Sequence, residues 1–586
     1  MPWFLQVFRW RCVASTTWLL LTCVVELLLL QLLASCRPLH LVLWIGDWIS
    51  NLLSWRMMVL MVIYLIMAIS SSILHSWCYT VHLPVYKNRV AIIWSVLQPR
   101  HLAVVALFIV LGACSGFCVA EMRGYHGLWE SCDEHQWCLN ERLLFCFCHG
   151  VYVGLYFGIG YFVKKEHFLV FPSIQQRKLF RVRGHIRSHL WEGFVWTLKG
   201  LRLYYLSYFL LVLVLKKPLQ SVFYLQPSSR IDSLIGLLDV YLFIHCLIAG
   251  TVIHSTWTFG LRLFRVFQTE AIRFHVVPVF SQEASRQLIK AMRAKETPLL
   301  MHFGYLDLYQ LALHSASRRK QVFSLNQSGQ PSTWNEIYGE CIALINSMVT
   351  RLGGQLQSQK TPAGPLIPSD IPVGAAPAAK DWPELPSLTS AGFTRRIVQS
   401  EKARLWSYPP SEGVEGIGAS LKPQPPVTGG IQVAAKQLRN FVKNIPKALV
   451  TALKKKPFFA YFVTDFPEVG IQEQFADCKL QVWAIMSLSE LAAASYREDT
   501  YGVVQRSLPT IFTALISLSQ VVDKHVKSPL STSKSTRNVR IAIESNGKYA
   551  VKSAIQTALY CLATTFSKER RSFLLTEEHR QYLDSF

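Results

Sequence analysis

Ionisable side chains inside long apolar stretches are the first candidates for functional groups in this sequence. Charged groups in lipid cost about 2.5 to 3.5 kcal/mol each on insertion scales, so they often mark a transport pathway. The apolar stretches show no internal repeat and no pair of Gly/Pro-broken segments, which favours hydrogen bonding between helices or snorkelling. A membrane transporter or channel stays the alternative hypothesis. The residues concerned are Glu26, His75, Lys199, Arg202, Asp239 and His245.

Sequence motifs of catalysis and cofactor binding are missing. There is no phosphate-binding Gly-rich loop, no His-Glu-x-x-His, no Gly-x-Ser-x-Gly and no dinucleotide fingerprint. The 17 histidines are scattered, and the 14 cysteines show no zinc-ligand spacing. Cys146 and Cys148 lie in an apolar run, where packing explains them better than redox chemistry.

These observations predict a protein that is not an enzyme and that carries no cofactor and no metal. A lipid-modifying membrane enzyme is a third hypothesis, kept because membrane active sites are poorly marked in sequence. The basic half of the chain contains no aromatic-interleaved RNA-binding signature, so no direct nucleic-acid partner is expected.

The longest apolar runs lie within the first 255 residues, and these runs contain the ionisable side chains named above. Hydrophobic residues make up 51% of the 586 residues and charged residues only 16%. A helix that crosses the hydrocarbon core needs about 20 apolar residues. Six runs qualify: Cys12–Ser35, Met57–Thr80, Leu102–Ala120, Leu143–Val163, Phe194–Leu215 and Ser233–His254. The first run lacks a clean cleavage site, so we expect a signal anchor rather than a cleaved signal peptide.

A shorter run, Leu41–Trp55, contains Asp47 and Asn51 and is rich in tryptophan, which is typical of a helix lying in the membrane interface.

The distribution of Lys and Arg predicts the orientation, because basic loops resist translocation. Basic residues precede the first run and follow the second and the fourth, whereas the loop between runs three and four is acidic. That loop is therefore expected in the lumen, where Cys132 and Cys138 are close enough in sequence to form a disulfide. Both termini should face the cytosol, and the net charge of +24 should favour contact with anionic surfaces.

The second half of the chain is predicted to be soluble and mainly helical. A basic amphipathic stretch, Leu261–Arg273, leaves the membrane, and a helix capped by Thr333 and Glu336 is expected to end at Gly353 and Gly354. Residues 355–430, rich in Pro, Gly, Ala and Ser, are predicted to be a disordered linker with a short binding helix at 393–406. Three further helices are expected at Phe475–Ala494, Tyr501–Val526 and Tyr549–Phe566.

The stretch Gln432–Lys456 is basic and amphipathic, with seven basic residues and no acidic one. Such a segment can lie on an anionic membrane surface, and Pro446 implies a kink or two consecutive helices. A helix packed on its own domain is the alternative. The candidate membrane-surface contacts are Lys436, Leu438, Arg439, Phe441, Val442, Lys443, Ile445, Lys447 and Leu449.

An ordered series of segments in the second half resembles the transmembrane nucleoporins of the nuclear division cycle family, the pore-membrane anchors of the nuclear pore complex. Together with the six apolar runs, the resemblance covers most of the chain except the linker. The segments are Thr333–Val349, Phe458–Val463, Phe475–Trp483, Asp499–Pro509, Val521–His525, Ala558–Phe566 and Glu578–Gln581.

The resemblance implies a structural membrane anchor and assembly factor of the nuclear pore complex that recruits scaffold nucleoporins through its C-terminal half. It also implies residence in the nuclear envelope at the pore membrane, with an endoplasmic reticulum pool left open. The implied partners are inner-ring scaffold nucleoporins, other pore-membrane proteins, an Aladin-like propeller protein and the lipid bilayer. Self-association into a homo-oligomer is left open.

The predicted fold is therefore all-α: a polytopic membrane protein with about six transmembrane helices and a cytosol-facing helical C-terminal domain interrupted by a disordered linker. The predicted division is a transmembrane domain at 1–255, a juxtamembrane helical region at 256–354, the linker at 355–430, and a C-terminal helical domain at 431–586 that begins with the basic segment.

Overall fold

The structure is a computed structural model. It describes residues 2–34, 41–122, 129–133, 136–172, 175–223, 239–277, 283–325, 332–360, 457–466, 469–526, 539–569, 573 and 575–584. The described part is helical apart from one two-stranded hairpin, which confirms the predicted fold class.

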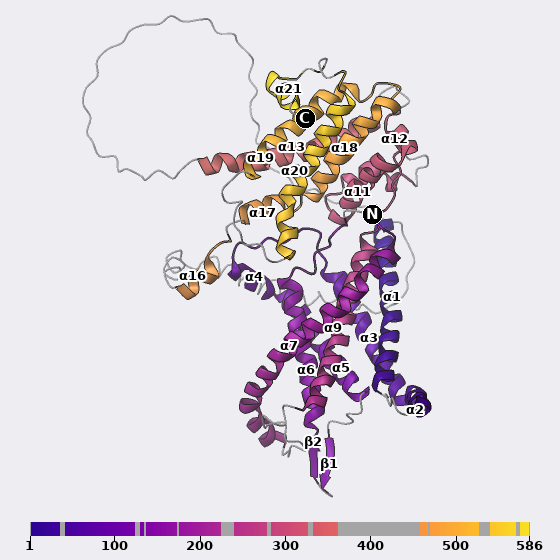
Figure 1. The fold of residues 1–586 in the computed structure, drawn as a ribbon, viewed down its shortest axis with the longest axis vertical. Coiled ribbons are helices and arrows are strands. Elements are labelled where there is room, and N and C mark those ends of the chain that lie inside the picture. Colours follow the sequence, from indigo (N-terminus) through magenta and orange to yellow (C-terminus); the bar gives the residue numbers. More distant parts are fainter. Residues whose placement is uncertain are drawn as a thin grey trace, which may run out of the picture.

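Long apolar helices run side by side along the long axis of the molecule and form its lower half in Figure 1. Within the described residues, five segments are long and apolar enough to cross a membrane, and they overlap five of the six predicted runs; the last one ends at Gln268 rather than at the predicted His254. They lie in α1 (Pro2–Ala34), α3 (Trp55–Cys78), α5 (Pro99–Met122), α6 (Glu141–Val163) and α9 (Val240–Gln268).

The sixth predicted run, Phe194–Leu215, lies in the 46-residue helix α7 (Lys178–Phe223). The side chains of α7 after residue 210 lie outside the described residues, so this span stays a prediction. Helix α7 packs along α9, which in turn contacts α1, α3, α5 and α6 and is therefore the centre of the bundle.

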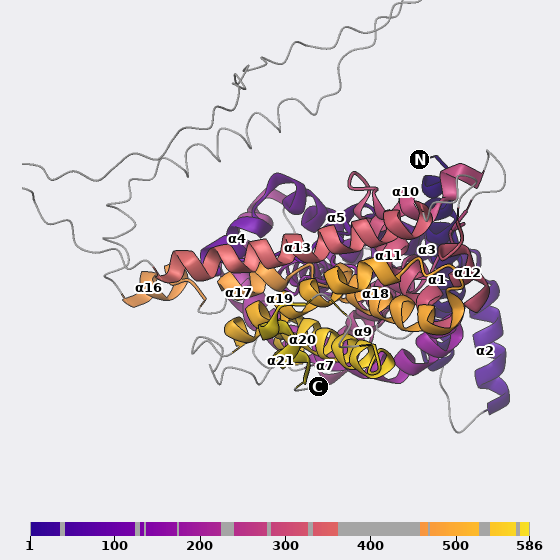
Figure 2. The same ribbon diagram turned by 90° about the horizontal axis from the view of Figure 1, so that it is seen from above.

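Two small elements lie at the lower end of the bundle, which we call the hairpin end. Strands β1 (Trp129–Asp133) and β2 (Gln136–Leu139) pair antiparallel at the bottom of Figure 1. Helix α2 (Leu41–Leu53) is seen along its length from above, so it runs across the membrane helices (Figure 2). Its apolar side chains, such as Val42 and Leu53, are exposed, as expected for the predicted interfacial helix.

The opposite end of the bundle, which we call the domain end, carries a bundle of helices that we call the helical unit. The unit is built from two stretches of chain, residues 269–360 and 457–584, that flank residues 361–456. Its elements are η1 (Glu283–Arg286), α10 (Leu288–Met292), α11 (Pro298–His314), α12 (Ala316–Val322), α13 (Ser332–Lys360), α16 (Pro457–Val463), α17 (Val469–Phe475), α18 (Lys479–Glu498), η2 (Gln505–Ser507), α19 (Leu508–Val526), α20 (Val539–Thr565) and α21 (Glu577–Asp584).

The two stretches pack against each other in one hydrophobic core. Helix α18 contacts α11 and α13, and α13 also contacts α19. The core contains Trp334 and Ile345 from before residues 361–456 and Trp483 and Phe512 from after them. The three predicted C-terminal helices are confirmed as α18, α19 and α20, with shifted boundaries.

The predicted end of the long soluble helix is wrong. Helix α13 starts at Ser332, so Thr333 lies inside it, and it continues through Gly353 and Gly354 to Lys360. Both glycines are in open space, and the following residues Gln355–Lys360 include good helix formers, so the helix tolerates a cost of about 1 kcal/mol per glycine.

Three of the predicted features lie outside the described residues: most of the linker at 355–430, the short helix at 393–406, and the basic segment Gln432–Lys456 with its candidate contacts. The predicted domain boundaries at 255 and 354 fall inside α9 and α13, and the boundary at 430 lies outside the described residues. The division into domains stays a prediction.

Candidate membrane anchor and its junction with the helical unit

Helices α5 and α6 touch through their backbones. A Cβ atom added at Gly154 would lie 2.2 Å from the carbonyl oxygen of Phe108, and one added at Gly112 would lie 2.3 Å from that of Gly150. Small residues allow such an approach between membrane helices, where burial of apolar area gives little driving force. The spacing of Gly112 and Gly116, and of Gly150, Gly154 and Gly158, is the sequence signal of this contact, which was not among the predicted features.

Glu26 is held by hydroxyl groups of the central helix α9. Its carboxylate accepts hydrogen bonds from Ser255 Oγ at 3.4 Å and from Thr256 Oγ1 at 3.1 Å. The hydroxyl of Tyr64 is 2.9 Å from Thr256 Oγ1, so α1, α3 and α9 meet at this point. His75 Nε2 lies 3.1 Å from the carbonyl oxygen of Trp257, one residue further along α9. Glu26 and His75 therefore form hydrogen bonds between helices, in agreement with the prediction of interhelical hydrogen bonding for the ionisable groups in the apolar runs.

The remaining predicted intramembrane groups lie elsewhere in the bundle. Asp239 caps α9 by accepting from the backbone of Tyr241 at 2.9 Å, and its carboxylate lies 3.3 Å from Arg142 at the start of α6. It is therefore at the hairpin end and not at mid-membrane. His245 is buried among the helices, whereas Lys199 and Arg202 line cavities beside α7.

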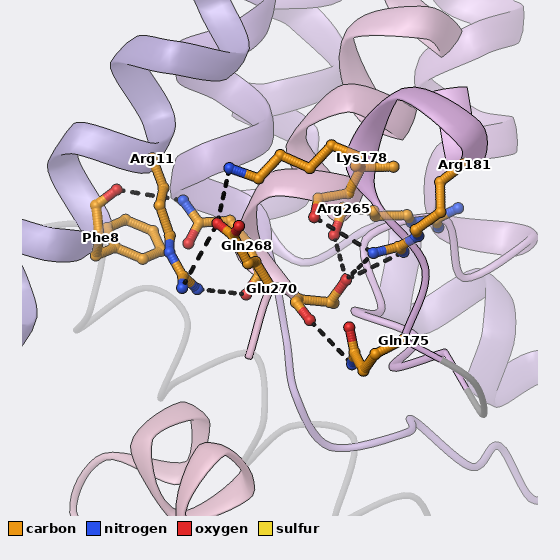
Figure 3. A network of polar contacts seen from close by, with 10 residues as sticks. Phe8, Arg11, Gln175, Lys178, Arg181, Arg265, Gln268 and Glu270 are labelled. Carbon is orange, nitrogen blue, oxygen red and sulfur yellow. Dashed lines mark hydrogen bonds and ion pairs between the residues drawn. The ribbon is translucent and has the colours of Figure 1, made fainter. Parts of the chain in front are cut away.

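A polar collar surrounds the point where α9 leaves the bundle at the domain end (Figure 3). Glu270 lies 2.8 Å from Lys178 and 3.9 Å from Arg11. The buried amide of Gln268 donates to the carbonyl oxygen of Phe8 at 3.2 Å, and Arg181 donates to Thr269 Oγ1 at 3.2 Å. The collar ties together the ends of α1, α7 and α9.

Aromatic side chains fix the helical unit to the domain end of the bundle. Phe4 of α1 packs edge-on against Phe303 of α11 at 6.2 Å, and Phe171, in the loop after α6, packs against Trp483 of α18 at 5.6 Å. Phe4, Phe171 and Phe264 of α9 belong to the same core as the helical unit. The hydrophobic core is therefore continuous from the membrane helices into the unit.

His302 is buried in this junction. Its ring stacks on Phe171 with centroids 5.3 Å apart, and its Nδ1 lies 2.8 Å from the carbonyl oxygen of Pro298. Burial lowers the pKa of His302 to about 4, only partly offset by the hydrogen bond to Pro298. Burial likewise lowers the pKa of His167, which lies in the loop after α6, to about 4. Both side chains are therefore neutral at pH 7.

A second junction lies at the side of the bundle, where α16 meets α4 (Arg89–Val96). Arg89 donates to the carbonyl oxygen of Tyr461 at 2.7 Å, and its guanidinium lies 3.8 Å from the centre of the Tyr461 ring. Asn88 donates to Asp465 at 3.2 Å. Nearby, His82 Nδ1 lies 2.9 Å from the carboxylate of Asp477. Residues that follow 361–456 are thus held beside the membrane helices.

Polar contacts also join the two stretches of the helical unit. Arg319 of α12 bonds both oxygens of Glu498 of α18, at 2.6 and 2.9 Å. This hydrogen bonding to the guanidinium lowers the pKa of Glu498. The fully buried Trp334 donates its indole N–H to Ser507 at 3.1 Å, and Arg351 donates to the carbonyl oxygen of Gln474 at 2.9 Å.

The predicted disulfide cysteines lie in the hairpin. The register places Cys138 opposite Glu130 and Cys132 at the irregularity between Ser131 and Asp133. The two cysteines are therefore diagonal neighbours across the strands; their side chains lie outside the described residues, and their pairing stays a prediction. In the part of the chain that the structure describes, no three His, Cys, Asp or Glu side chains are grouped as metal ligands would be.

Comparison with known proteins matches the whole chain. The family model described as nucleoporin protein Ndc1-Nup matches residues 6–584. Nucleoporin NDC1 of Xenopus laevis is 28% identical over 650 residues, which cover 99% of this chain and 98% of that protein. Nucleoporin NDC1 of Danio rerio is 29% identical, with 100% of this chain and 98% of that protein covered.

A more distant relative, nucleoporin Ndc1 of Drosophila melanogaster, is 22% identical over 73% of this chain and 71% of that protein. The family match covers both the membrane helices and the helical unit, in agreement with the resemblance found in the sequence. The chain is therefore a transmembrane nucleoporin that belongs to the Ndc1-Nup family.

Proposed function

We propose that this protein is a structural anchor and assembly factor of the nuclear pore complex. Its membrane helices embed in the pore membrane, both termini face the cytosol or the pore channel, and the helical unit recruits scaffold nucleoporins. The proposed partners are inner-ring nucleoporins, other pore-membrane proteins and an Aladin-like propeller protein. An endoplasmic reticulum pool and self-association of the chain are compatible with this function.

The observation that carries the proposal is the continuous core between membrane helices and helical unit. Because Phe4 and Phe264 lie in the same core as Phe303 and Trp483, the unit has a defined orientation relative to the bundle. A protein docked on the unit would therefore be held at a fixed place beside the membrane. This is the mechanical requirement for an anchor, and it needs no catalytic group.

The proposed orientation is supported by the positions of the charged loops. The basic residues Lys178 and Arg181 and the helical unit lie at the domain end, whereas the acidic loop between α5 and α6 lies at the hairpin end. Basic residues favour the cytosolic side, so the domain end is the cytosolic end in our proposal. The hairpin end then lies in the lumen, where Cys132 and Cys138 can form a disulfide.

We also retain the proposal that Gln432–Lys456 contacts the membrane surface. Its last residue directly precedes α16, and α16 packs on α4 at the side of the membrane bundle. The chain connectivity thus brings the end of the basic segment close to the headgroups at the domain end. Its lysines would then face anionic lipids while Phe441 and Ile445 enter the interface.

The test replaces the endogenous protein in cells with tagged variants of the full chain. The first variant, Trp334→Ala, removes a fully buried side chain and is expected to destabilise the helical unit. The second exchanges residues 361–456 for a Gly/Ser linker of about 20 residues. Recruitment of inner-ring nucleoporins to the nuclear rim is measured by super-resolution imaging. We expect Trp334→Ala to lose recruitment and the linker exchange to keep it. Recruitment that survives Trp334→Ala but not the exchange would move the docking surface to residues 361–456.

The same cells test the orientation. A C-terminal tag should be accessible to antibody after the plasma membrane alone is permeabilised, and the signal should coincide with pores. A tag that stays protected would contradict the proposed topology, and a diffuse endoplasmic reticulum or plasma-membrane signal would contradict the anchor function.

A further inference from the structure

A cavity of about 490 Å³ opens between α6, α7 and α9 near the domain end. Its wall includes apolar and aromatic residues from all three helices, such as Phe157, Trp196 and Leu261. What distinguishes it is a ring of charged side chains: Lys164, Glu166, Glu192, Lys199, Arg262 and Arg265.

Cations outnumber carboxylates in this cavity by four to two. Arg262 is paired with Glu192, and Arg265 Nη2 lies 2.9 Å from the carboxylate of Glu166, so both carboxylates are engaged. Lys164 Nζ lies 5.4 Å from the centre of the Trp196 ring. Among the described residues, the Lys199 side chain has no ion-pair or hydrogen-bond partner. The cavity therefore has an excess positive charge that suits an anionic ligand.

The outer end of the cavity, at Lys164 and Arg262, lies at the level of the lipid headgroups. Helix α9 begins at Val240, and at 1.5 Å per residue Arg262 lies about 33 Å along it, slightly more than a hydrocarbon core of about 30 Å. Lys164 directly follows Val163, the last residue of α6. Trp191, on the rim of the cavity, is 67% exposed, and tryptophan is typical of the membrane–water interface.

The space next to the cavity is mainly apolar, although Arg202 also lines it. A second cavity of about 560 Å³, between α7 and α9, is lined by Leu198, Leu201, Val240 and Phe243 among others and shares Lys199 with the first. The stem of Lys199 thus separates a charged compartment from an apolar one. This arrangement suits a ligand with a charged head and an apolar body better than a small soluble anion.

We propose that the charged cavity between α6, α7 and α9 binds a phospholipid with a net anionic headgroup from the leaflet at the domain end. Lys164 and Lys199 contact the phosphate, and the indole rings of Trp191 and Trp196 pack beside the glycerol region. The proposal goes beyond the anchor function, which requires only that the helices be embedded, and it can fail without that function failing.

The test uses the purified full chain in phosphatidylcholine nanodiscs with increasing amounts of phosphatidylserine. Native mass spectrometry then measures the anionic lipid that stays bound to the protein. A basic residue near an anionic lipid headgroup contributes an affinity factor of about five. We therefore expect Lys164→Gln and Lys199→Gln each to weaken phosphatidylserine retention about fivefold, and the double variant about 25-fold.

Two matched variants separate this site from general charge effects. Arg202→Gln removes the same charge from α7, but Arg202 lines only the apolar cavity, so retention should stay unchanged. Glu192→Gln removes a carboxylate from the charged cavity and should increase retention, a gain that misfolding cannot produce. Equal retention by the double variant and the unaltered protein would overturn the proposal, as would an equal loss in Arg202→Gln.

A competition experiment identifies the source of the phosphate. Glycerol 3-phosphate added at millimolar concentration should leave phosphatidylserine retention unchanged. If it displaces the lipid, the cavity binds a soluble phosphate and the lipid proposal is wrong.

Discussion

Two pairs of neighbouring helices in this protein are packed in opposite ways. Between α5 and α6 several residues at the contact are glycines, and the backbone at Gly154 touches the backbone at Phe108. Between α11 and α18, large side chains such as Phe303 and Trp483 contribute to the core. The difference reflects the solvent. Removing apolar surface from water stabilises a fold by about 25 cal/mol per Å², whereas removing it from lipid does not. Membrane helices are therefore stabilised by close van der Waals contact of their backbones.

The largest loss of stability is expected at Trp334, whose side chain is fully buried in the helical unit. Replacing a buried Trp by Ala costs about 3–5 kcal/mol. We expect Trp334→Ala to destabilise α19 as well as α13, because the two helices share this core. Hydrogen exchange of the full chain in detergent measures both, with Trp334→Phe as the milder control. Unchanged protection of α19 would show that the two stretches do not form one cooperative unit.

The close contact between α5 and α6 is tested at Gly154. Its added Cβ would lie 2.2 Å from a backbone oxygen, so Gly154→Ala should separate α5 from α6 and destabilise the bundle by about 1–3 kcal/mol. Unfolding of the purified protein in increasing denaturing detergent measures the loss. The control is Gly339→Ala in α13, where the added Cβ meets open space and helix propensity should stabilise by up to about 1 kcal/mol. The same sign for both substitutions would contradict the packing described.

The junction between the two regions should be sensitive to acid. Burial lowers the pKa of His302 from 6.5 to about 4, so between these values the unfolded chain binds more protons than the folded protein, and stability falls as the pH decreases. From pH 7 to pH 5 the expected loss is about 2 kcal/mol for His302, and His167 adds a similar amount. Thermal unfolding at both pH values measures the total.

The variant His302→Phe keeps an aromatic ring against Phe171 and removes the titrating group. It should reduce the acid-induced loss by about 2 kcal/mol, the share expected for His302 alone. An acid-induced loss of full size in His302→Phe would exclude His302 as the origin.

The smallest expected effect concerns the polar contact between α12 and α18. Arg319 and Glu498 form a bidentate pair, and a double-mutant cycle with Arg319→Gln and Glu498→Gln should give a coupling energy of about 1 kcal/mol. A coupling energy this small, set against the loss expected for Trp334→Ala, would show that the stability of the helical unit depends on its apolar core much more than on its ion pairs. A coupling near zero would mean that the pair is fully replaced by water.

Much of the membrane region could be predicted because lipid imposes a simple rule on length and hydropathy. Five apolar runs lie in helices long enough to cross a membrane, although α1 and α9 extend beyond the predicted runs, and the short tryptophan-rich run became α2. The glycine contact between α5 and α6 was also predictable, because the glycines recur at every fourth residue in both segments. Asp239 was harder to place, because a capping residue and a mid-membrane residue look alike in a hydropathy profile.

The junction could not be predicted from periodicity. Phe171 lies in a short loop with no repeating pattern, and its partners His302 and Trp483 are more than a hundred residues away. Helical spacing indicates which face of a helix is buried but not what buries it. For the same reason the joining of α13 to α19 across residues 361–456 had no sequence signal, and the helix-breaking rule applied to Gly353 and Gly354 pointed to a helix end that the structure does not have.

The continuity of α9 has a mechanical consequence. This single helix of 29 residues begins at the hairpin end, crosses the bundle and ends among the core residues of the helical unit, and α1 runs beside it to the same core. A tensile load applied to the helical unit is therefore transmitted through the shared core and along two helix axes into the bilayer. If a scaffold docks on the helical unit as proposed above, stretching of the membrane around the protein would displace that scaffold, and the scaffold would in turn resist widening of the membrane.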